Sequence, residues 1–407
     1  MSTRRPGKPQ ASRQRALPAP PKKSAPSKKS APVSVPAPMA GVDPRVALGV
    51  GLVGSIAALA ATSVVAGIEL ERRVFNQTQR GHGGSGEPFF SLRSPGPEVI
   101  TPDGLRMHVE VDEIDAYPRT DGRTGAYAGV TLVFVHGYVL SLDCFHFQRA
   151  HFRGLAKLVL YDQRSHGKTG RSPAEHCRVP QLARDLAQII EATTTPEEKV
   201  VLIGHSMGGM TIQELAKQRP EWFGDKVTGV GLICTSPGNM TANPFLKRVP
   251  GPMFLRLADS VLSVLNRVPG LVDKTLNTPT DLSWLTTKRL AFGSDVPPDY
   301  VEFMSEMIGR TGIEVVNDYW PAIREFEGEP AFPALNRVEA TVIGGVDDHI
   351  LSIAHSDRIV QLLPGADYHR IEDGGHMTQI EHHQEVNEAL EAMVARTLRP
   401  AARSLTG

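Results

Sequence analysis

The sequence predicts an α/β protein with a mostly parallel β-sheet, helices on both faces of that sheet and an inserted helical subdomain. From about residue 97 onward, short runs rich in Val, Ile and Leu alternate with helical stretches, which is typical of a parallel sheet covered on both faces. One interval of about a hundred residues between two strands contains only helical patterns, so we expect an inserted helical subdomain, the lid segment named below, at about 237–337. The domain as a whole is expected to span 97–400.

Before this domain lies a basic, proline-rich segment. Residues 1–45 hold ten Lys and Arg, one acid and ten of the 32 prolines, a composition that predicts a disordered tail. The tail is expected to be a solvated tether, or alternatively an arm that touches anionic lipid headgroups. The zero net charge of the chain therefore combines a tail of +9 with a remainder of −9, and an acidic remainder argues against nucleic-acid binding.

An uncharged stretch follows the tail. Residues 46–68 contain no charged side chain in 23 positions, enough for a helix to cross a bilayer, and we predict a single transmembrane helix here. The alternatives are a cleavable signal peptide, with Val64 and Ala66 at the cleavage site, and a buried helix. Because the wider tail is basic, the large domain that follows is expected outside the cytoplasm.

Residues 69–96 are interpreted as a linker. The run Gly81-His-Gly83-Gly-Ser-Gly86 matches a dinucleotide-binding pattern, but it neither follows a strand nor opens a helix. Gly167-Lys168-Thr169 resembles only the tail of a phosphate-binding loop. The three cysteines are far apart without a CxxC pair, which excludes a Cys-based zinc site. The sequence thus predicts neither a metal nor an organic cofactor.

The strands and helices of the domain can be placed from their patterns. Apolar runs predict seven strands, at 107–111, 131–135, 157–161, 199–203, 227–234, 340–343 and 368–371. Helical periodicity predicts helices at 181–192, 208–218, 356–363 and 384–399. Within the lid, residues 252–266 and the stripe Val301, Met304 and Ile308 are expected to pack on the domain, or alternatively to line an acyl pocket or meet a lipid interface.

The chemistry is expected where the strand at 199–203 runs into Gly204-His205-Ser206-Met207-Gly208 and then into a helix. This G-x-S-x-G pattern between a strand and a helix is typical of a sharp turn that exposes a nucleophilic serine. We therefore predict Ser206 as the nucleophile. The backbone N–H of Met207 is the expected first donor to the oxyanion.

A serine nucleophile needs a base and a carboxylate that orients the base. His376 follows the last predicted strand on a glycine-containing loop and is the predicted base, whereas His382 and His383 are expected to be surface residues. Asp348 is the predicted acid, and Asp347 stays open as an alternative because the preceding glycine pair permits a one-residue shift.

A second oxyanion donor is expected from the loop after the strand at 131–135. His136-Gly137-Tyr138 lies there, and the backbone N–H of Tyr138 is the predicted donor. Glycine at position 137 would let the chain bend inward without a side chain in the pocket.

These residues together resemble the α/β-hydrolase superfamily over about 97–400. The run Asp162-Gln-Arg-Ser-His-Gly167 is similar to that superfamily's Asp-x-Arg-Gly-His-Gly loop, with Ser165 in place of glycine. Asp348 to Ser352 resembles its Asp-x-x-x-Pro, with serine in place of proline. The resemblance implies that the insertion is the family's lid and that Ser206, Asp348 and His376 match its nucleophile, acid and base.

The expected function is a membrane-anchored carboxylesterase or lipase that acts on apolar or lipid-like esters without a cofactor. Ser206 argues against epoxide hydrolases and dehalogenases of this fold, which need a carboxylate nucleophile. An acyltransferase or a cofactor-free perhydrolase would use the same triad with another acceptor. A catalytically silent scaffold that binds a ligand or partner at the membrane is the alternative from outside the enzymes.

Overall fold

The computed structural model describes residues 84–238 and 281–399, which all belong to one compact unit at 65–407. The predicted tail at 1–45, the predicted transmembrane helix at 46–68 and the apolar lid segment at 252–266 lie outside the described residues. Among the residues that are described, no helix is long and apolar enough to span a bilayer.

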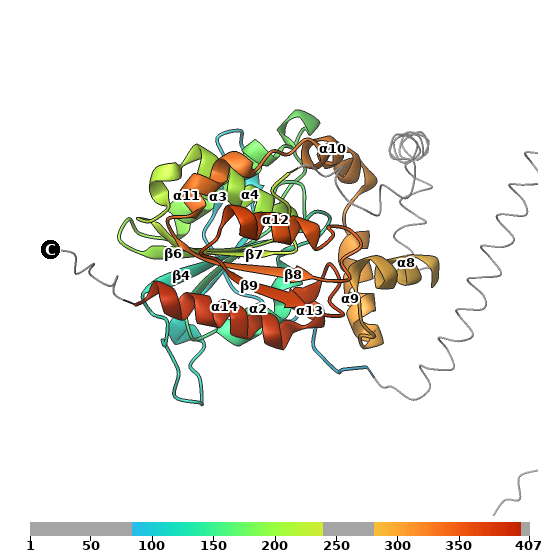
Figure 1. Cartoon of the computed structure of the whole chain (residues 1–407), viewed down its shortest axis with the longest axis horizontal. Coiled ribbons are helices and arrows are strands. Elements are labelled where there is room, and N and C mark those ends of the chain that lie inside the picture. Colours follow the sequence, from blue (N-terminus) through green and yellow to red (C-terminus); the bar gives the residue numbers. More distant parts are fainter. Residues whose placement is uncertain (1–83, 239–280, 400–407) are drawn as a thin grey trace, which may run out of the picture. The chain divides into compact units, whose positions relative to one another are not determined.

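A seven-stranded sheet forms the centre of the described unit (Figure 1). Its order is β3-β5-β4-β6-β7-β8-β9; β3 is antiparallel to β5, and every other pair is parallel. The strands are β3 (Val109–Asp112), β4 (Val130–Val135), β5 (Lys157–Tyr161), β6 (Lys199–His205), β7 (Val227–Ile233), β8 (Glu339–Gly345) and β9 (Asp367–Ile371). A separate two-stranded antiparallel sheet pairs β1 (Val99–Ile100) with β2 (Arg106–Met107).

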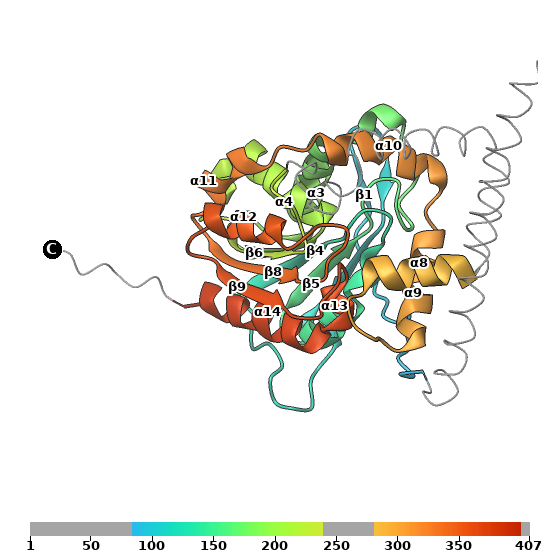
Figure 2. The same cartoon turned by 45° about the vertical axis from the view of Figure 1, so that its right-hand side comes forward.

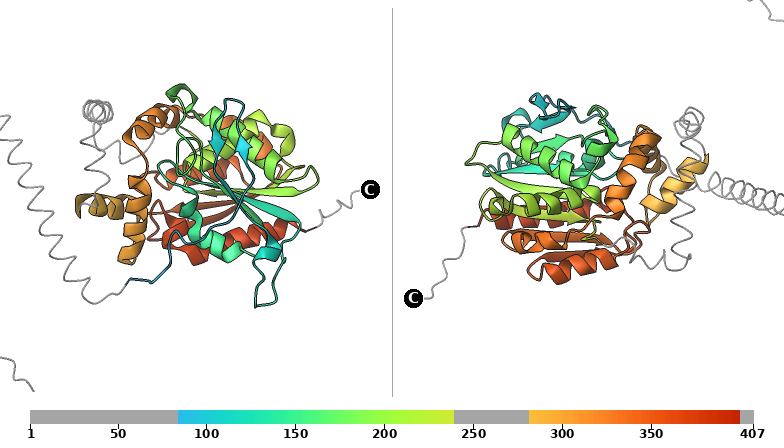
Figure 3. Two further views of the ribbon diagram at one scale, coloured as in Figure 1. Left: turned by 180° about the vertical axis from the view of Figure 1, so that it is seen from behind. Right: turned by 90° about the horizontal axis from the view of Figure 1, so that it is seen from above.

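Helices cover both faces of the sheet, as the sequence predicts (Figures 1 and 3). Alternation along β4 shows the cause: Leu132 and Phe134 enter the apolar core on one face, and Val133 and Val135 enter the core on the other. One face carries α2 (His146–Phe152), α13 (Thr378–Glu381) and α14 (His383–Thr397). The other carries α3 (Val179–Thr193), α4 (Met207–Gln218), α11 (Phe332–Leu335) and α12 (Ala354–Leu362).

The described part of the insertion is helical. It contains α8 (Asp281–Ala291), α9 (Pro298–Gly309) and α10 (Ile313–Arg324), which lie at the end of the sheet toward which β8 and β9 point (Figure 2). Val301 and Met304 of α9 are fully buried in the same core as α2 and α14, and Ile308 packs against that core. The expectation that this stripe packs on the domain is therefore confirmed for α9.

The described end of the predicted linker, residues 84–96, packs against the domain. Phe89 stacks on Phe303 of α9, with ring centroids 4.1 Å apart, and meets Phe147 of α2 edge-on at 5.8 Å. Arg310 lies over the ring of Phe90 at 4.1 Å. This segment therefore joins a lid helix to a helix of the central domain, because its two aromatic side chains have apolar surface to bury.

Candidate active site

Ser206, the predicted nucleophile, sits in a strained turn between β6 and α4. Its backbone angles are φ 53° and ψ −119°, a region that residues other than glycine rarely adopt. The turn needs small neighbours, because a Cβ added to Gly208 would lie 1.9 Å from the carbonyl oxygen of Val135. The G-x-S-x-G pattern therefore forms the strand-to-helix elbow that the sequence predicts.

The predicted base and acid lie side by side. His376 Nδ1 is 2.7 Å from Asp348 Oδ2, and both side chains are buried. The other carboxylate oxygen, Oδ1, accepts the backbone N–H groups of Ile350 and Leu351 at 2.8 Å each. Asp347, the alternative acid, is exposed to solvent. The arrangement holds the Asp348 carboxylate in a fixed direction toward His376.

His205, the residue before Ser206, connects the elbow to the loop that carries His376. Its Nε2 lies 2.9 Å from the carbonyl oxygen of His376, and since a carbonyl can only accept, the proton of His205 is on Nε2. Burial and the neighbouring His376 lower the pKa of His205 well below its ordinary value, so the ring is neutral. The sequence placed His205 inside the motif but gave no signal for this role.

The loop that carries Tyr138 lies against the elbow. A Cβ added to Gly137 would be 2.8 Å from His205 Nδ1 and 3.1 Å from Ser206 Cβ, so only glycine fits. The Gly137 carbonyl accepts a hydrogen bond from His136 Nδ1 at 2.7 Å, which fixes the plane of the Gly137–Tyr138 peptide. Across 84–238 and 281–399, no backbone carbonyl accepts the N–H of Tyr138.

His136 is held by a second network that the sequence did not reveal. Its Nε2 accepts the backbone N–H of Gln163 at 2.8 Å, which requires the proton on Nδ1, toward Gly137. The side-chain amide of Gln163 in turn donates to the His136 carbonyl at 2.5 Å, and its oxygen accepts the hydroxyl of Thr211 on α4. Burial and His166 lower the pKa of His136 to about 3, so this tautomer persists at neutral pH.

The loop from Asp162 to Gly167 is held in place by hydrogen bonds within the protein. The buried Asp162 carboxylate accepts the backbone N–H groups of Leu142 and Lys168 at 2.8 Å each, and burial raises its pKa to about 6. Ser165, which stands where the resembled loop has glycine, adopts φ 65°. Its hydroxyl accepts the N–H of Ser172 at 3.0 Å, which helps to hold that conformation.

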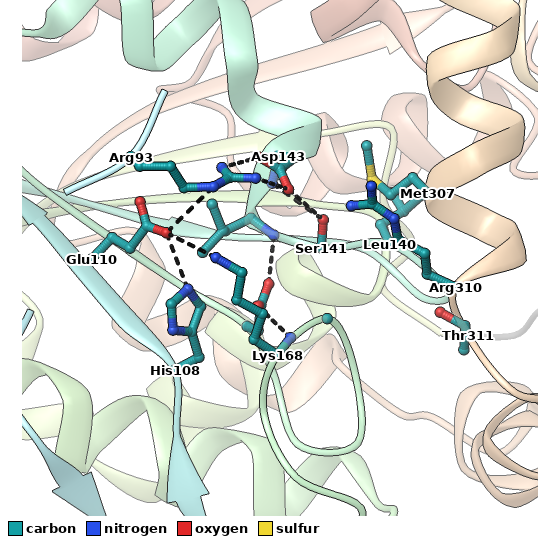
Figure 4. A pocket seen from close by; sticks show the side chains of 13 residues that line it. Arg93, His108, Glu110, Leu140, Ser141, Asp143, Lys168, Met307, Arg310 and Thr311 are labelled. Carbon is teal, nitrogen blue, oxygen red and sulfur yellow. Dashed lines mark hydrogen bonds and ion pairs between the residues drawn. The ribbon is translucent and has the colours of Figure 1, made fainter. Parts of the chain in front are cut away.

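A cavity of about 80 Å³ lies between β3, the loop at 140–143, the loop at 162–168 and the end of α9 (Figure 4). None of the five predicted site residues lines it. Its charges pair with one another: Glu110 lies within 4.0 Å of Arg93, His108 and Lys168, and Arg93 also pairs with Asp143. We therefore interpret it as a packing gap between ion pairs and place the chemistry at Ser206.

The cysteines and His383 lie in packed surroundings. The three cysteines, Cys144, Cys177 and Cys234, are free and buried. In the part of the chain that the structure describes, no cluster of His, Cys, Asp or Glu could hold a metal ion. His383, expected at the surface, is half-buried, because its ring stacks on Phe147 with centroids 3.9 Å apart.

Stability should fall as the pH falls from about 6.5 toward 4, because three histidines around the site are buried and neutral. Burial lowers the pKa of His136 to about 3, that of His166 to about 4, and that of His205 further below its ordinary value. In this window the unfolded chain binds these protons and the folded chain does not, so the free energy of unfolding decreases with decreasing pH. Each histidine contributes at most about 1.4 kcal/mol per pH unit.

Urea unfolding at pH 7 and pH 5 measures this dependence. Asp162 acts in the opposite sense, since its raised pKa means that the folded chain binds a proton that the unfolded chain does not. A His166→Gln variant keeps a donor for the Arg164 carbonyl. Its free energy of unfolding should change less between pH 7 and pH 5 than that of the wild type, because one buried neutral histidine has been removed. Equal slopes in the variant and the wild type would refute the assignment of His166 as a buried neutral group.

Comparison with known proteins places this geometry in context. Residues 130–383 match the family described as alpha/beta hydrolase fold. The sn-1-specific diacylglycerol lipase ABHD11 of Mus musculus is 24% identical over 286 residues, 65% of this chain and 80% of that protein. Protein ABHD8 of Mus musculus is 26% identical over 329 residues, 76% of this chain and 68% of that protein. The esterase EaEST from Exiguobacterium antarcticum superposes with a TM-score of 0.57 at 16% identity, covering 74% of this chain and all (100%) of that one.

Proposed function

Because the chain belongs to the α/β-hydrolase fold family, we propose that it is a serine hydrolase that cleaves carboxylic esters through an acyl-enzyme on Ser206. The observation that carries this proposal is the Asp348–His376 hydrogen bond of 2.7 Å. The loop of His376 is joined through His205, at 2.9 Å, to the strained strand-to-helix turn that holds Ser206. A nucleophile, an acid and a base in this order along the chain (Ser206, Asp348, His376) are what acyl transfer by this fold requires.

The proposed reaction proceeds in two halves. Ser206 Oγ attacks the carbonyl carbon as His376 accepts the hydroxyl proton, and the oxyanion is bound by the backbone N–H groups of Tyr138 and Met207. The intermediate collapses when His376 returns the proton to the departing alkoxide, which releases the alcohol and leaves an acyl ester on Ser206. Water then attacks this ester as His376 takes its proton. The bond between the acyl carbon and Ser206 Oγ breaks as His376 returns that proton to Oγ, which releases the acid and restores the enzyme.

The acyl group of the substrate is proposed to be apolar. Met207 and Met210 of α4 share an apolar cluster with Val315 and Ile323 of α10, so the lid side of the elbow is built from apolar side chains. Such a surface favours an alkyl chain over a charged group. The similarity to a diacylglycerol lipase supports the same substrate class.

We also propose that the chain is anchored in a membrane by residues 46–68, with the hydrolase domain outside the cytoplasm. The support is the uncharged run of 23 residues and the basic tail before it. An anchor of this kind would hold the active site close to lipid-like esters.

The test is hydrolysis of p-nitrophenyl esters from acetate to palmitate by the full chain in detergent, with Ser206→Ala as the blank. We expect labelling by a fluorophosphonate and ester hydrolysis, both lost in the variant, with an optimum at medium or long acyl chains. Serine labelling without hydrolysis would instead favour transfer to an acceptor other than water, and absence of labelling would refute the serine mechanism. In cell fractions prepared without detergent, the full chain should sediment with membranes and residues 69–407 should not.

A further inference from the structure

The loop that carries Tyr138 is tied to the lid by two hydrogen bonds. The Tyr138 hydroxyl donates to the carbonyl of Val316 on α10. The Thr311 hydroxyl, between α9 and α10, donates to the carbonyl of Val139 at 3.2 Å. Tyr138 can therefore act in two ways, because its backbone N–H is the proposed oxyanion donor and its side chain contacts the lid.

Val139, whose carbonyl accepts the second of these hydrogen bonds, has a strained backbone. Val139 has φ 56°, and a β-branched residue in the left-handed region is a genuine outlier that persists only where surrounding contacts hold it. The contact that reaches Val139 from the lid is the Thr311 hydroxyl. Without it, relaxation of Val139 toward an extended conformation would rotate the adjoining Tyr138–Val139 peptide. Through Tyr138, this rotation would displace the preceding peptide, which bears the Tyr138 N–H.

The lid can act as a fixed support because α10 is itself attached to the central domain. Several contacts share this attachment, since Val315 and Ile323 of α10 lie in one apolar cluster with Met207 and Met210 of α4. The hydroxyl of the fully buried Tyr319 also donates to the Arg164 carbonyl at 3.0 Å, and loss of this one hydrogen bond would leave the other contacts of α10 in place. Asp318 pairs with Arg171. Burial raises the pKa of the Tyr138 hydroxyl, so it stays protonated and can donate to α10 at any ordinary pH.

We propose that the side chains of Tyr138 and Thr311 are positioning residues that hold the oxyanion-binding N–H of Tyr138 in place by tying its loop to the lid. This inference rests on the proposed function. It assigns the lid a part in the chemical step itself, in addition to covering the substrate. Preorganised donors stabilise a developing oxyanion only when their direction is fixed beforehand, and that is what the two ties supply.

The test compares Tyr138→Phe and Thr311→Val, each of which removes one hydroxyl and leaves the backbone N–H in place. We expect kcat to fall about tenfold in each, with KM unchanged within about twofold, since the lost interaction is made in the transition state. A trifluoromethyl ketone, which forms an oxyanion on Ser206, should bind more weakly by the same factor. The matching methyl ketone should bind equally well to the wild type and the variants.

Tyr319→Phe is the matched control. It removes a tyrosine hydroxyl from α10 together with its hydrogen bond to the central domain, but it removes no hydrogen bond to the oxyanion loop. It should lower the denaturation midpoint while leaving kcat within about twofold of the wild type. A loss of kcat equal to that of Tyr138→Phe would mean that general loosening of the lid is responsible, and would overturn the proposal.

Val139→Asn tests the part played by strain. Asparagine tolerates the left-handed region, so the loop should need the Thr311 tie less. Thr311→Val should therefore cost a smaller factor in kcat in the Val139→Asn background than in the wild type, and an equal cost in both would overturn this step. If the wild type shows Ser206-dependent hydrolysis but the Tyr138 and Thr311 variants keep its kcat, only this inference fails; without Ser206-dependent activity, the proposed function fails as well.

Discussion

Replacing Asp348 by asparagine should lower kcat/KM for an ester substrate by about 10⁴-fold while leaving the fold intact. Asparagine has the size of aspartate, and its oxygen can still accept the N–H groups of Ile350 and Leu351. Its NH₂ group would then face His376 Nδ1, where it can only donate, so the ring would carry its proton on Nε2 and could not accept one from Ser206. Steady-state hydrolysis and the rate of fluorophosphonate labelling should both report this loss.

Asp347→Asn is the matched control for this change. Asp347 is exposed, and the hydrogen bond it makes to the Gly374 carbonyl comes from its backbone N–H, which the substitution keeps. We expect kcat/KM to stay within about twofold of the wild type. A large loss in the Asp347 variant together with a small loss in the Asp348 variant would show that the wrong neighbour has been assigned as the acid.

The choice between these two aspartates also shows where sequence reasoning reached its limit. A strand, a glycine pair and two consecutive carboxylates predict an acid in this loop but allow a one-residue shift. The conformation settles which carboxylate turns inward, because Val346 N–H bonds to the Ile371 carbonyl and Asp347 N–H to the Gly374 carbonyl. These contacts to the neighbouring loop come from residues far away in the sequence.

Most of the sheet was predictable because its strands are buried on both faces. Such strands appear as continuous apolar runs, and the predicted run at 157–161 coincides with β5. The elbow was predictable for a similar reason, since its glycines are required by backbone contacts at fixed spacing. The helices at 181–192 and 208–218 lie within two residues of α3 and α4.

The features that the sequence did not predict depend on polar side chains and on their hydrogen-bond partners. Helix α2 is only seven residues long and contains His146, Gln148 and Arg149, so it has no clear apolar periodicity. The roles of His136 and His205 depend on which ring nitrogen carries the proton, and this is fixed by carbonyl and amide partners in other loops. No pattern of residue types encodes such partners.

Arg149→Met should lower the free energy of unfolding by about 3–5 kcal/mol, because it leaves buried carboxylates without their main partner. Arg149 is fully buried on α2 and donates to Asp112 at 2.9 Å and to Glu110 at 2.7 Å, two buried acids on edge strand β3. Burial raises the pKa of Glu110, but hydrogen bonds from His108 and Arg149 outweigh burial and bring it to about 2. Methionine fills the same space and supplies no donor.

Two comparisons separate this loss of charge pairing from a simple loss of packing. Arg358 makes a similar bidentate contact with Glu329 at 2.8 and 3.0 Å, but both side chains are about half exposed. Because water screens this pair, Arg358→Met should leave the denaturation midpoint in urea nearly unchanged. Without Arg149, the pKa of Glu110 should rise, so the folded variant should take up a proton as the pH falls. The gap between the Arg149 variant and the wild type in urea should therefore narrow from pH 7 to pH 5, and adding Glu110→Gln should restore part of the stability at pH 7. A gap that stayed constant with pH, and that Glu110→Gln did not reduce, would mean that Arg149 acts through the packing of its side chain rather than through its charge.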